Sequence, residues 1–235
     1  MPGRLFLVPN LLGVVPPGNV LPARTIAVAG GLAHFVVENA KPARAFLKTI
    51  GTALPLQQIG ITELGAQPSP QRCAELLAPA RGGTDLGMLS DAGCPGVADP
   101  GSLLVAAAHR EGIAVVPLVG PSAVLLALMA SGMNGQGFTF HGYLPVKPEA
   151  RAEAIRRLEA ASHESGAAQL FIETPYRNAA LIGALAATCR PGTRLCVAAD
   201  LTAETETIEA RDIRAWRGRD LTAYAKRPAM FVLQA

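Results

Sequence analysis

The feature that most constrains the fold is a loop of small residues and prolines that runs from Ser90 to Gly101. It follows an apolar segment at residues 86–89, which is typical of a buried strand, and it precedes a helix-forming segment at residues 102–111. Its three glycines allow close backbone approach and positive φ angles, and its two prolines stiffen it. In an open α/β sheet, a loop at this place lies at the carboxyl ends of the strands, where small ligands bind. The sequence therefore predicts a ligand-binding loop, with a plain turn as the alternative.

Short apolar segments alternate with helix-forming segments along the first half of the chain. The expected strands are residues 4–8, 25–29, 35–37, 86–89 and 113–119. The expected helices are residues 41–50, 69–82 and 102–111. This alternation predicts a mainly parallel sheet joined by crossover helices. After Gly120-Pro121-Ser122, a helix over residues 123–133 is apolar nearly all round and is expected to be buried, with its amino end available to an electron-rich group.

The second half of the chain begins a new set of elements. The expected strands are residues 138–140, 168–173, 195–199, 205–210 and 230–233, and the expected helices are 147–161 and 176–188. A turn is expected at Gly142-Tyr143-Leu144-Pro145. The sequence therefore predicts an α/β protein of two α/β domains. Residues 1–119 would hold a mainly parallel sheet, and residues 120–235 would hold a mixed one.

Composition limits the classes of partner. The chain has 235 residues, of which 50% are hydrophobic and 17% charged, so a sizeable core can form. A net charge of +3 is too small to indicate a nucleic-acid partner by itself, and an aromatic content of 5% argues against a stacking platform for single strands. No export signal or membrane span is recognised, and the four cysteines and four histidines show no metal-ligand spacing. These features predict a reduced, cytoplasmic protein that holds no metal.

Several catalytic motifs are not found in the sequence. No Gly-x-Gly-x-x-Gly sequence opens a helix, and there is no Walker loop. His163-Glu164 lacks the second histidine of a zinc-protease helix, and Ser122 lacks the flanking glycines of a nucleophile elbow. Nucleotide triphosphatase and hydrolase activities are therefore disfavoured.

Four segments, in order, resemble the tetrapyrrole methylase superfamily, a class of S-adenosylmethionine-dependent methyltransferases with two α/β domains. The resemblance is greatest to the branch of the ribosomal RNA small-subunit methyltransferase I type. The segments are residues 90–101, residues 120–123 with 130–132, residues 142–145 with Lys147 and Arg151, and residues 173–177. The agreement covers most of residues 85–180 and extends more loosely over both ends.

The resemblance implies a cofactor, S-adenosylmethionine, folded in a cleft between the two domains. The residues that it implies for cofactor binding are Pro9, Asp91, Ala92, Gly93, Cys94, Val97, Ser122, Ala123, Glu173, Thr174, Leu201, Pro228 and Ala229. It also implies a homodimer. For an anionic substrate such as RNA, the expected contacts are Lys147, Arg151 and Arg177. A hydroxyl acceptor would benefit from a base, for which Asp91, Asp99, Glu38 and Glu173 are the candidates by position.

The departures from the family pattern weaken the expectation of RNA binding more than that of cofactor binding. After the first strand, where the branch carries a Gly-Asn-Leu-type loop, this chain reads Pro9-Asn10-Leu11-Leu12-Gly13. The segments 38–41 and 199–203 also differ from the pattern, and the second of them loses two cations. Lost cations weaken binding to phosphates. Two alternatives therefore stay open: methylation of a tetrapyrrole or another metabolite, and a non-catalytic sensor that binds S-adenosylmethionine.

Overall fold

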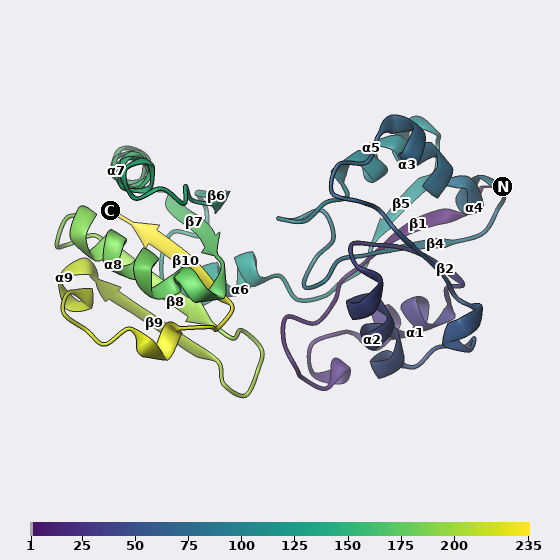
Figure 1. Cartoon of the computed structure of the whole chain (residues 1–235), viewed down its shortest axis with the longest axis horizontal. Coiled ribbons are helices and arrows are strands. Elements are labelled where there is room, and N and C mark those ends of the chain that lie inside the picture. The colour runs from purple at the N-terminus through teal and green to yellow at the C-terminus, as the bar shows by residue number, and fades with distance from the viewer. Residues whose placement is uncertain (1) are drawn as a thin grey trace. The chain divides into compact units, whose positions relative to one another are not determined.

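The protein is described from a computed structural model that covers residues 2–235 (Figure 1). The chain forms two compact units, one ending at Ser122 (unit 1) and one from Ala123 to Ala235 (unit 2). The domain boundary predicted after residue 119 lies in the same connection, between β5 (Ala114–Pro117) and α6 (Ala123–Ser131). Two α/β units were expected, and that fold class is confirmed.

Unit 1 is built on a parallel sheet of five strands. They are β1 (Arg4–Val8), β2 (His34–Val37), β3 (Gly60–Glu63), β4 (Leu86–Leu89) and β5. Their order is β3-β2-β4-β1-β5, and every neighbouring pair is parallel. Parallel neighbours need crossover connections. These contain α1 (Ala23–Gly31), α2 (Ala40–Ile50), α3 (Pro70–Leu76), α4 (Ala78–Arg81), α5 (Ser102–Arg110) and the short 3₁₀-helices η1 (Pro17–Asn19) and η2 (Leu56–Gln58).

Helices cover both faces of this sheet, with α1 and α2 on one face and α3, α4 and α5 on the other (Figure 1). Successive strand residues point to opposite faces. Leu5 and Val36 accordingly pack with α3, α4 and α5, whereas Phe6 and Phe35 pack with α1 and α2. Because both faces are buried, the strands read as continuous apolar runs, which is why most of them were recognisable.

One strand prediction in unit 1 was wrong, and one strand was missed. Residues 25–29 lie in α1, which begins directly after Pro22 and buries Thr25 and Ala29, four residues apart. A short run of apolar residues fits either structure, and tertiary packing decides between them. The missed strand, β3, lies at the edge of the sheet and is only partly buried, so its sequence carries no strong apolar signal.

Unit 2 holds a mixed sheet. Its strands are β6 (Phe138–Tyr143), β7 (Ala168–Glu173), β8 (Arg194–Ala199), β9 (Thr207–Asp212) and β10 (Ala229–Gln234), in the order β6-β7-β10-β8-β9. Only β6 and β7 are parallel. The helices are α6, α7 (Pro148–Ser165), α8 (Asn178–Thr188), α9 (Ile213–Trp216) and the 3₁₀-helices η3 (Pro175–Arg177) and η4 (Thr222–Tyr224).

The core of unit 2 lies between the sheet and α7, α8 and α9. Phe171 of β7 stacks on Phe231 of β10 with ring centroids 5.7 Å apart, and the buried Trp216 donates a hydrogen bond from Nε1 to the Leu195 carbonyl at 3.2 Å. Helix α6 packs against β8, β9 and β10. It was expected to be buried all round, but Leu125 and Met129 are exposed, because only one side of it faces the strands.

Candidate functional site

The topology of unit 1 selects one place on its sheet. From β1 the chain passes through α1 to β2, and from β4 it passes through α5 to β5, on the other side of β1. These two connections leave the neighbouring strands β1 and β4 in opposite directions and cover opposite faces. Such a reversal leaves a crevice at the carboxyl ends of the two strands, which is where ligands bind in open α/β sheets. The loop 90–101 begins there.

Asn10, directly after β1, holds the start of this loop. Its backbone N–H donates to the Gly93 carbonyl at 2.8 Å. Its side-chain amide donates to the carbonyls of Ser90 at 3.0 Å and Asp91 at 2.9 Å. Asn10 is buried, so these bonds are protected from water. This role of Asn10 was not predicted from the sequence, in which Asn10 was noted only as part of the segment 9–13 that departs from the family pattern. The available signal was a polar residue placed directly after a buried strand.

The other end of the loop depends on glycine at position 101. Gly101 has φ +141°, and a Cβ added there would lie 1.6 Å from Cε of Met88 in β4. In the first half of the loop, the Sγ of Cys94 donates a hydrogen bond to the Pro121 carbonyl at 3.4 Å. This bond links the loop to the connection that precedes α6. Pro9 packs against Gly120 of the same connection, since a Cβ there would meet the proline ring at 2.3 Å.

Three candidate catalytic carboxylates meet at this edge: Glu38 after β2, Asp91 after β4 and Asp99 within the loop. The backbone N–H of Asp91 donates to Oε2 of Glu38 at 3.2 Å, and the Asn39 amide donates to Oδ2 of Asp91 at 2.6 Å. Burial raises the pKa of Asp99 to about 6, with a further contribution from the negative charges of Glu38 and Asp91. The structure thus brings together three of the four carboxylates named as candidates from the sequence, while the fourth, Glu173, belongs to unit 2.

The unit 2 residues predicted for the cofactor also gather at one sheet edge. Ala229, at the start of β10, pairs with Glu173 at the end of β7 and with Ala199 at the end of β8. The N–H of Asp200 donates to the Pro228 carbonyl at 2.9 Å. Thr174, Leu201 and Pro228 are therefore neighbours of this edge in the sequence and in space. Leu201 is buried, whereas Val97, in unit 1, is exposed. A cofactor-binding role for these residues stays a prediction, as it does for Ser122 and for Ala123 at the start of α6.

Glu173 and Arg177 form a buried ion pair. The Glu173 side chain is 0% exposed, and its Oε1 accepts from Arg177 Nη2 at 2.6 Å, Arg177 Nε at 2.9 Å and the Thr174 N–H at 2.7 Å. Burial alone would raise the pKa of Glu173, but the hydrogen bonds from Arg177 and Thr174 outweigh it and lower that pKa. The other oxygen, Oε2, is buried without a partner in the described part of the chain.

The three predicted substrate contacts differ in their surroundings. Arg177 neutralises Glu173, so its charge is not free for a phosphate. Lys147 is exposed at the residue before α7, and Arg151 lies in the first turns of the same helix with a buried, unpaired Nε. Among residues 2–235 no carboxylate forms an ion pair with either Lys147 or Arg151, whereas Arg157, further along α7, is paired with Glu153.

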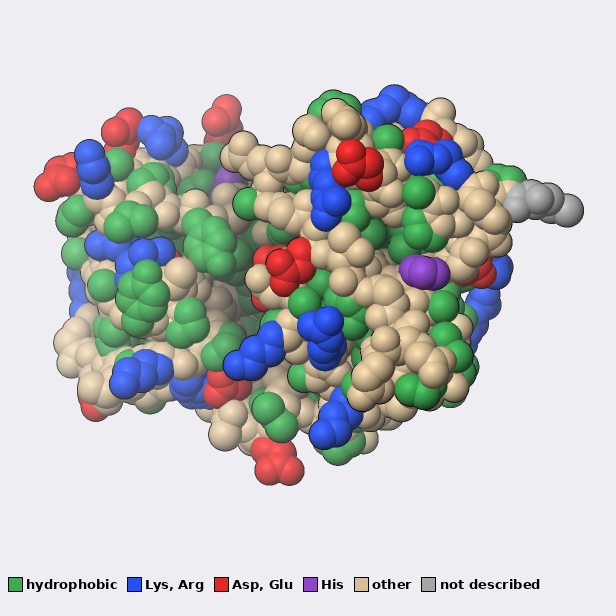
Figure 2. Space-filling view, turned by 45° about the vertical axis from the view of Figure 1, so that its right-hand side comes forward, with side chains coloured by type: hydrophobic (Ala, Val, Ile, Leu, Met, Phe, Trp, Pro, Cys, Tyr) green, Lys and Arg blue, Asp and Glu red, His purple; other side chains and the backbone are tan. Residues whose placement is uncertain are grey.

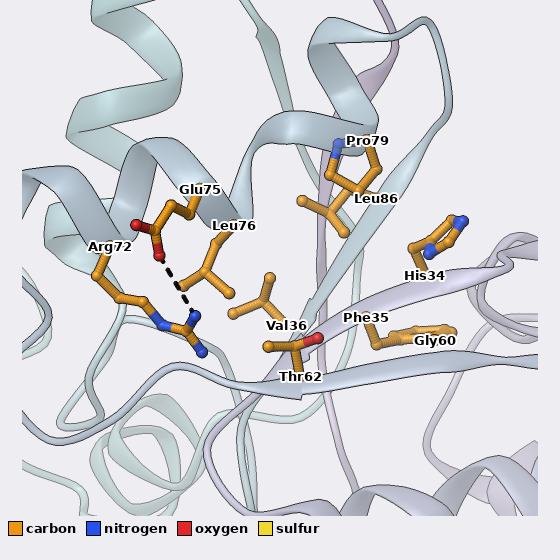
Figure 3. A pocket seen from close by; sticks show the side chains of 10 residues that line it. All are labelled: His34, Phe35, Val36, Gly60, Thr62, Arg72, Glu75, Leu76, Pro79 and Leu86. Atoms are coloured by element: carbon orange, nitrogen blue, oxygen red, sulfur yellow. Dashed lines mark ion pairs between the residues drawn. The ribbon is translucent and has the colours of Figure 1, made fainter.

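A pocket of about 260 Å³ lies elsewhere in unit 1, between α3 and strands β2, β3 and β4 (Figure 3). Arg72, one of the lining residues, joins α3 to the end of β3: its Nη1 lies 3.7 Å from Oε2 of Glu75, and its Nη2 donates to the Glu63 carbonyl at 3.0 Å. The lining includes none of the residues predicted for the site: it consists of His34, Phe35, Val36, Gly60, Thr62, Arg72, Glu75, Leu76, Pro79 and Leu86. This pocket is therefore separate from the loop 90–101.

Residues 2–235 contain neither a candidate metal site nor a candidate membrane span. Within that range, no three His, Cys, Asp or Glu side chains are grouped so that they could hold a metal ion. The same part of the chain contains no helix with the length and apolar character needed to cross a bilayer.

Comparison with known proteins bears on these arrangements. A family model described as tetrapyrrole (corrin/porphyrin) methylases matches residues 34–215. Proteins named ribosomal RNA small subunit methyltransferase I are similar over different lengths. The Xylella fastidiosa protein is 33% identical over 88% of this chain and 71% of its own length, and that of Escherichia coli O157:H7 is 30% identical over 93% and 73%. The Mesorhizobium japonicum protein is 38% identical over 60% of this chain, which spans about half (47%) of that relative.

Solved structures agree on the fold. The methyltransferase CobJ superposes with a TM-score of 0.65 over 99% of this chain and 94% of its own, at 19% identity. Cobalt precorrin-4 methyltransferase CbiF gives 0.63 over 98% and 94%, at 12% identity. The resemblance noted from the sequence is confirmed, because the family model covers most of the chain and two of the relatives match at 30% identity or more over most of their length. The chain belongs to the tetrapyrrole (corrin/porphyrin) methylase family.

Proposed function

We propose that this protein is an S-adenosylmethionine-dependent methyltransferase whose acceptor is RNA, at a ribose 2′-hydroxyl of ribosomal RNA. The observation that carries the proposal is the loop 90–101, held by Asn10 at the reversal between β1 and β4, in a chain of a methylase family. The names of the similar proteins supply the acceptor. Residues 9–13 and 199–203 depart from the family pattern, and these departures bear on whether RNA is the acceptor rather than on whether the cofactor binds.

The residues of the loop fit such a cofactor. Ala92 and Val97 are exposed small or apolar side chains, and the backbone at Gly93 is held in place by its hydrogen bond from Asn10. The nearby carboxylates of Glu38, Asp91 and Asp99 suit a cationic sulfonium. The cofactor, when bound, supplies an electrophilic methyl group. We propose that backbone groups from Asp91 to Cys94 hold it.

The chain's own contribution to the reaction is to align the acceptor, exclude water and take up a proton. A base works best when its pKa lies near the working pH. Of the three carboxylates, Asp99 has a pKa raised to about 6, while Asp91 is engaged by the Asn39 amide and Glu38 by the Asp91 N–H. We therefore propose that Asp99 takes the proton of the acceptor hydroxyl.

The test is transfer of label from S-adenosylmethionine to RNA. The purified protein is incubated with the labelled cofactor and with small-subunit ribosomal RNA, free or in the subunit, and calorimetry measures cofactor binding separately. We expect label in RNA, and we expect Asp99→Asn to lower the transfer rate by roughly 10²–10⁴-fold while the cofactor still binds. Glu75→Gln, in the separate pocket, is the control variant and should transfer at the normal rate.

Other outcomes of the same experiment select the alternatives. Label in a small-molecule fraction would indicate a tetrapyrrole or metabolite acceptor. Tight cofactor binding with label in no fraction would indicate a sensor. No binding of S-adenosylmethionine or its demethylated product would refute the proposal. A cytoplasmic location follows from the proposed acceptor, and both this location and the homodimer implied by the resemblance remain part of the proposal.

A further inference from the structure

Two of the chain's three tyrosines are exposed at the same corner of unit 2. Tyr143 ends β6 and is 58% exposed, and Tyr176 lies in η3, just after β7, and is 72% exposed. Strands β6 and β7 are parallel neighbours, so their carboxyl ends meet. Large aromatic side chains gain free energy from burial, and most of those in this fold are covered. Two exposed phenol rings at one sheet corner therefore need an explanation.

The buried ion pair holds one of these rings in place. The Arg177 guanidinium lies over the Tyr176 ring, with its Cζ 5.1 Å from the ring centroid, and Nη1 donates to the Tyr176 hydroxyl at 3.1 Å. Glu173 fixes the same guanidinium through Nε and Nη2. The pKa of Arg177 is raised, first by its hydrogen bond to Glu173 and also by the nearby hydroxyls of Tyr176 and Tyr143. Tyr176 is thus held against the guanidinium, and Tyr143, which pairs with Ile172 in the sheet, lies next to the residue that precedes Glu173.

Free positive charge lies close to the tyrosines in the sequence. Lys147 directly precedes α7 and Arg151 lies in its first turns, a short segment after Tyr143, and neither forms an ion pair with a carboxylate in the part of the chain that the structure describes. The visible face in Figure 2 shows Lys and Arg side chains interspersed with Asp and Glu rather than gathered in one broad patch. Two cations that follow Tyr143 this closely along the chain are therefore a better basis for recognition than the overall charge of +3.

We propose that Tyr143 and Tyr176 form a stacking platform for an unpaired base of the RNA acceptor, with Lys147 and Arg151 contacting the adjoining phosphates. Sequence-specific recognition of RNA targets single-stranded bases, which stack on aromatic side chains. Rings alone would suit any planar ligand, and unpaired cations alone would suit any anion. A nucleotide in a single strand combines a planar base with a phosphate. The inference rests on the proposed function, and it revises the expectation, drawn from the low aromatic content, that no stacking platform exists.

Fluorescence anisotropy with labelled RNA tests this. A single-stranded oligonucleotide and a duplex of the same sequence are titrated with the wild type and with Tyr143→Ala, Tyr176→Ala and Tyr176→Phe. Loss of one stacked base costs about 1–3 kcal/mol, so each alanine variant should weaken single-strand binding by roughly five- to a hundredfold. Tyr176→Phe keeps the ring and should stay within about twofold of the wild type. Ile208→Ala, an exposed apolar residue on β9, is the matched control.

The salt dependence separates stacking from phosphate contact. The slope of log Kd against log salt should be unchanged in the tyrosine variants, and it should fall by about 1 in Lys147→Met and in Arg151→Met. The fluorescence of Trp216, which is the chain's single tryptophan and is buried in the same unit, reports whether each variant is folded.

Four results would overturn the inference. If the wild type methylates RNA but both alanine variants bind single strands normally, the platform is wrong and the proposed function stands. If the wild type binds the cofactor but no RNA at about 50 mM salt, both the stacking platform and the proposed RNA acceptor are refuted. Equal losses for single strand and duplex would exclude stacking on an unpaired base. If the tyrosine variants shift only the sedimentation of the protein, a second copy of the chain covers the rings.

Discussion

Replacing Asp99 by asparagine should stabilise the protein above pH 7 and leave its stability unchanged near pH 4. The Asp99 carboxyl is partly buried beside Glu38 and Asp91, and no lysine or arginine of residues 2–235 forms an ion pair with any of the three. Its charged form is therefore less stable in the folded protein than in the unfolded chain. Asparagine has nearly the same shape and carries no charge, so the substitution removes this penalty.

The magnitude follows from the pKa. The pKa rises from 3.8 to about 6, a change of about two units. At 1.36 kcal/mol per unit this sets an upper limit of about 3 kcal/mol, and partial exposure of Asp99 to solvent reduces the expected gain to about 1–2 kcal/mol. Between pH 3.8 and about 6 the folded protein binds more protons at this site than the unfolded chain, so wild-type stability falls as pH rises through that range. Asp99→Asn has no titrating carboxyl at this position, so its free energy of unfolding should not show this decrease.

Urea unfolding of both proteins at pH 4 and pH 8 measures the difference. Far-UV circular dichroism follows the whole chain, and the fluorescence of Trp216, which lies in unit 2, provides an internal reference. Unchanged stability at pH 4 and a gain at pH 8 are expected. A loss at pH 8, or an effect of equal size at both pH values, would show that Asp99 is stabilised by its surroundings and that the electrostatic reasoning is wrong.

Three further substitutions test the packing. Gly101→Ala should destabilise the protein by about 1–3 kcal/mol, because of the positive φ and the contact with Met88, and a normal urea midpoint would contradict this. Arg177→Met should lower the free energy of unfolding at pH 8 by leaving the buried Glu173 unpaired, and should lower it less at pH 5, where that carboxyl can take up a proton; a loss independent of pH would exclude this cause. Phe231→Ala should cost about 3–5 kcal/mol in calorimetric or urea unfolding, and a loss below about 1 kcal/mol would show that the core can collapse around the gap.

The fold could be predicted from the sequence where burial leaves a clear pattern. Strands buried on both faces, such as Leu86–Leu89, read as continuous apolar runs, and the glycine-rich loop after them indicates a carboxyl edge. The pattern fails where burial is partial or where two structures fit equally. Residues 25–29 form a helix because they pack against the sheet and beside α2, which the local sequence does not determine. The edge strand Gly60–Glu63 is half-solvated and has too few apolar residues to be recognised.

The sequence predicted which segments form the candidate site, but it did not predict the contacts between them. Residues 90–101 and 173–177 could be identified from the order of the motifs, because glycine, proline and charged residues at strand ends can be recognised in the sequence itself. Contacts between segments that are far apart in the chain cannot be recognised from the sequence of a single protein. The bonds from Asn10 to Ser90 and Asp91 join residues 80 and 81 positions apart. Likewise, the sequence named Arg177 as a phosphate contact, and only the structure shows its guanidinium bound to Glu173.

The carboxylates at the loop of unit 1 differ from those at the strand ends of unit 2, and the proposed function accounts for the difference. In unit 2, Glu173 is paired with Arg177 and Asp200 with Arg227. At the loop of unit 1, burial raises the pKa of Asp99, and the negative charges of Glu38 and Asp91 raise it further. Natural proteins retain such unfavourable groups where a ligand relieves them. A sulfonium would relieve this repulsion, whereas the demethylated product, without that charge, would not. The wild type should therefore prefer cofactor over product more strongly at pH 8 than at pH 5. Asp99→Asn, more stable at pH 8, should lose that pH dependence in calorimetric titrations. If the preference is the same at both pH values in the wild type, then the carboxylates are not retained for the cofactor's charge.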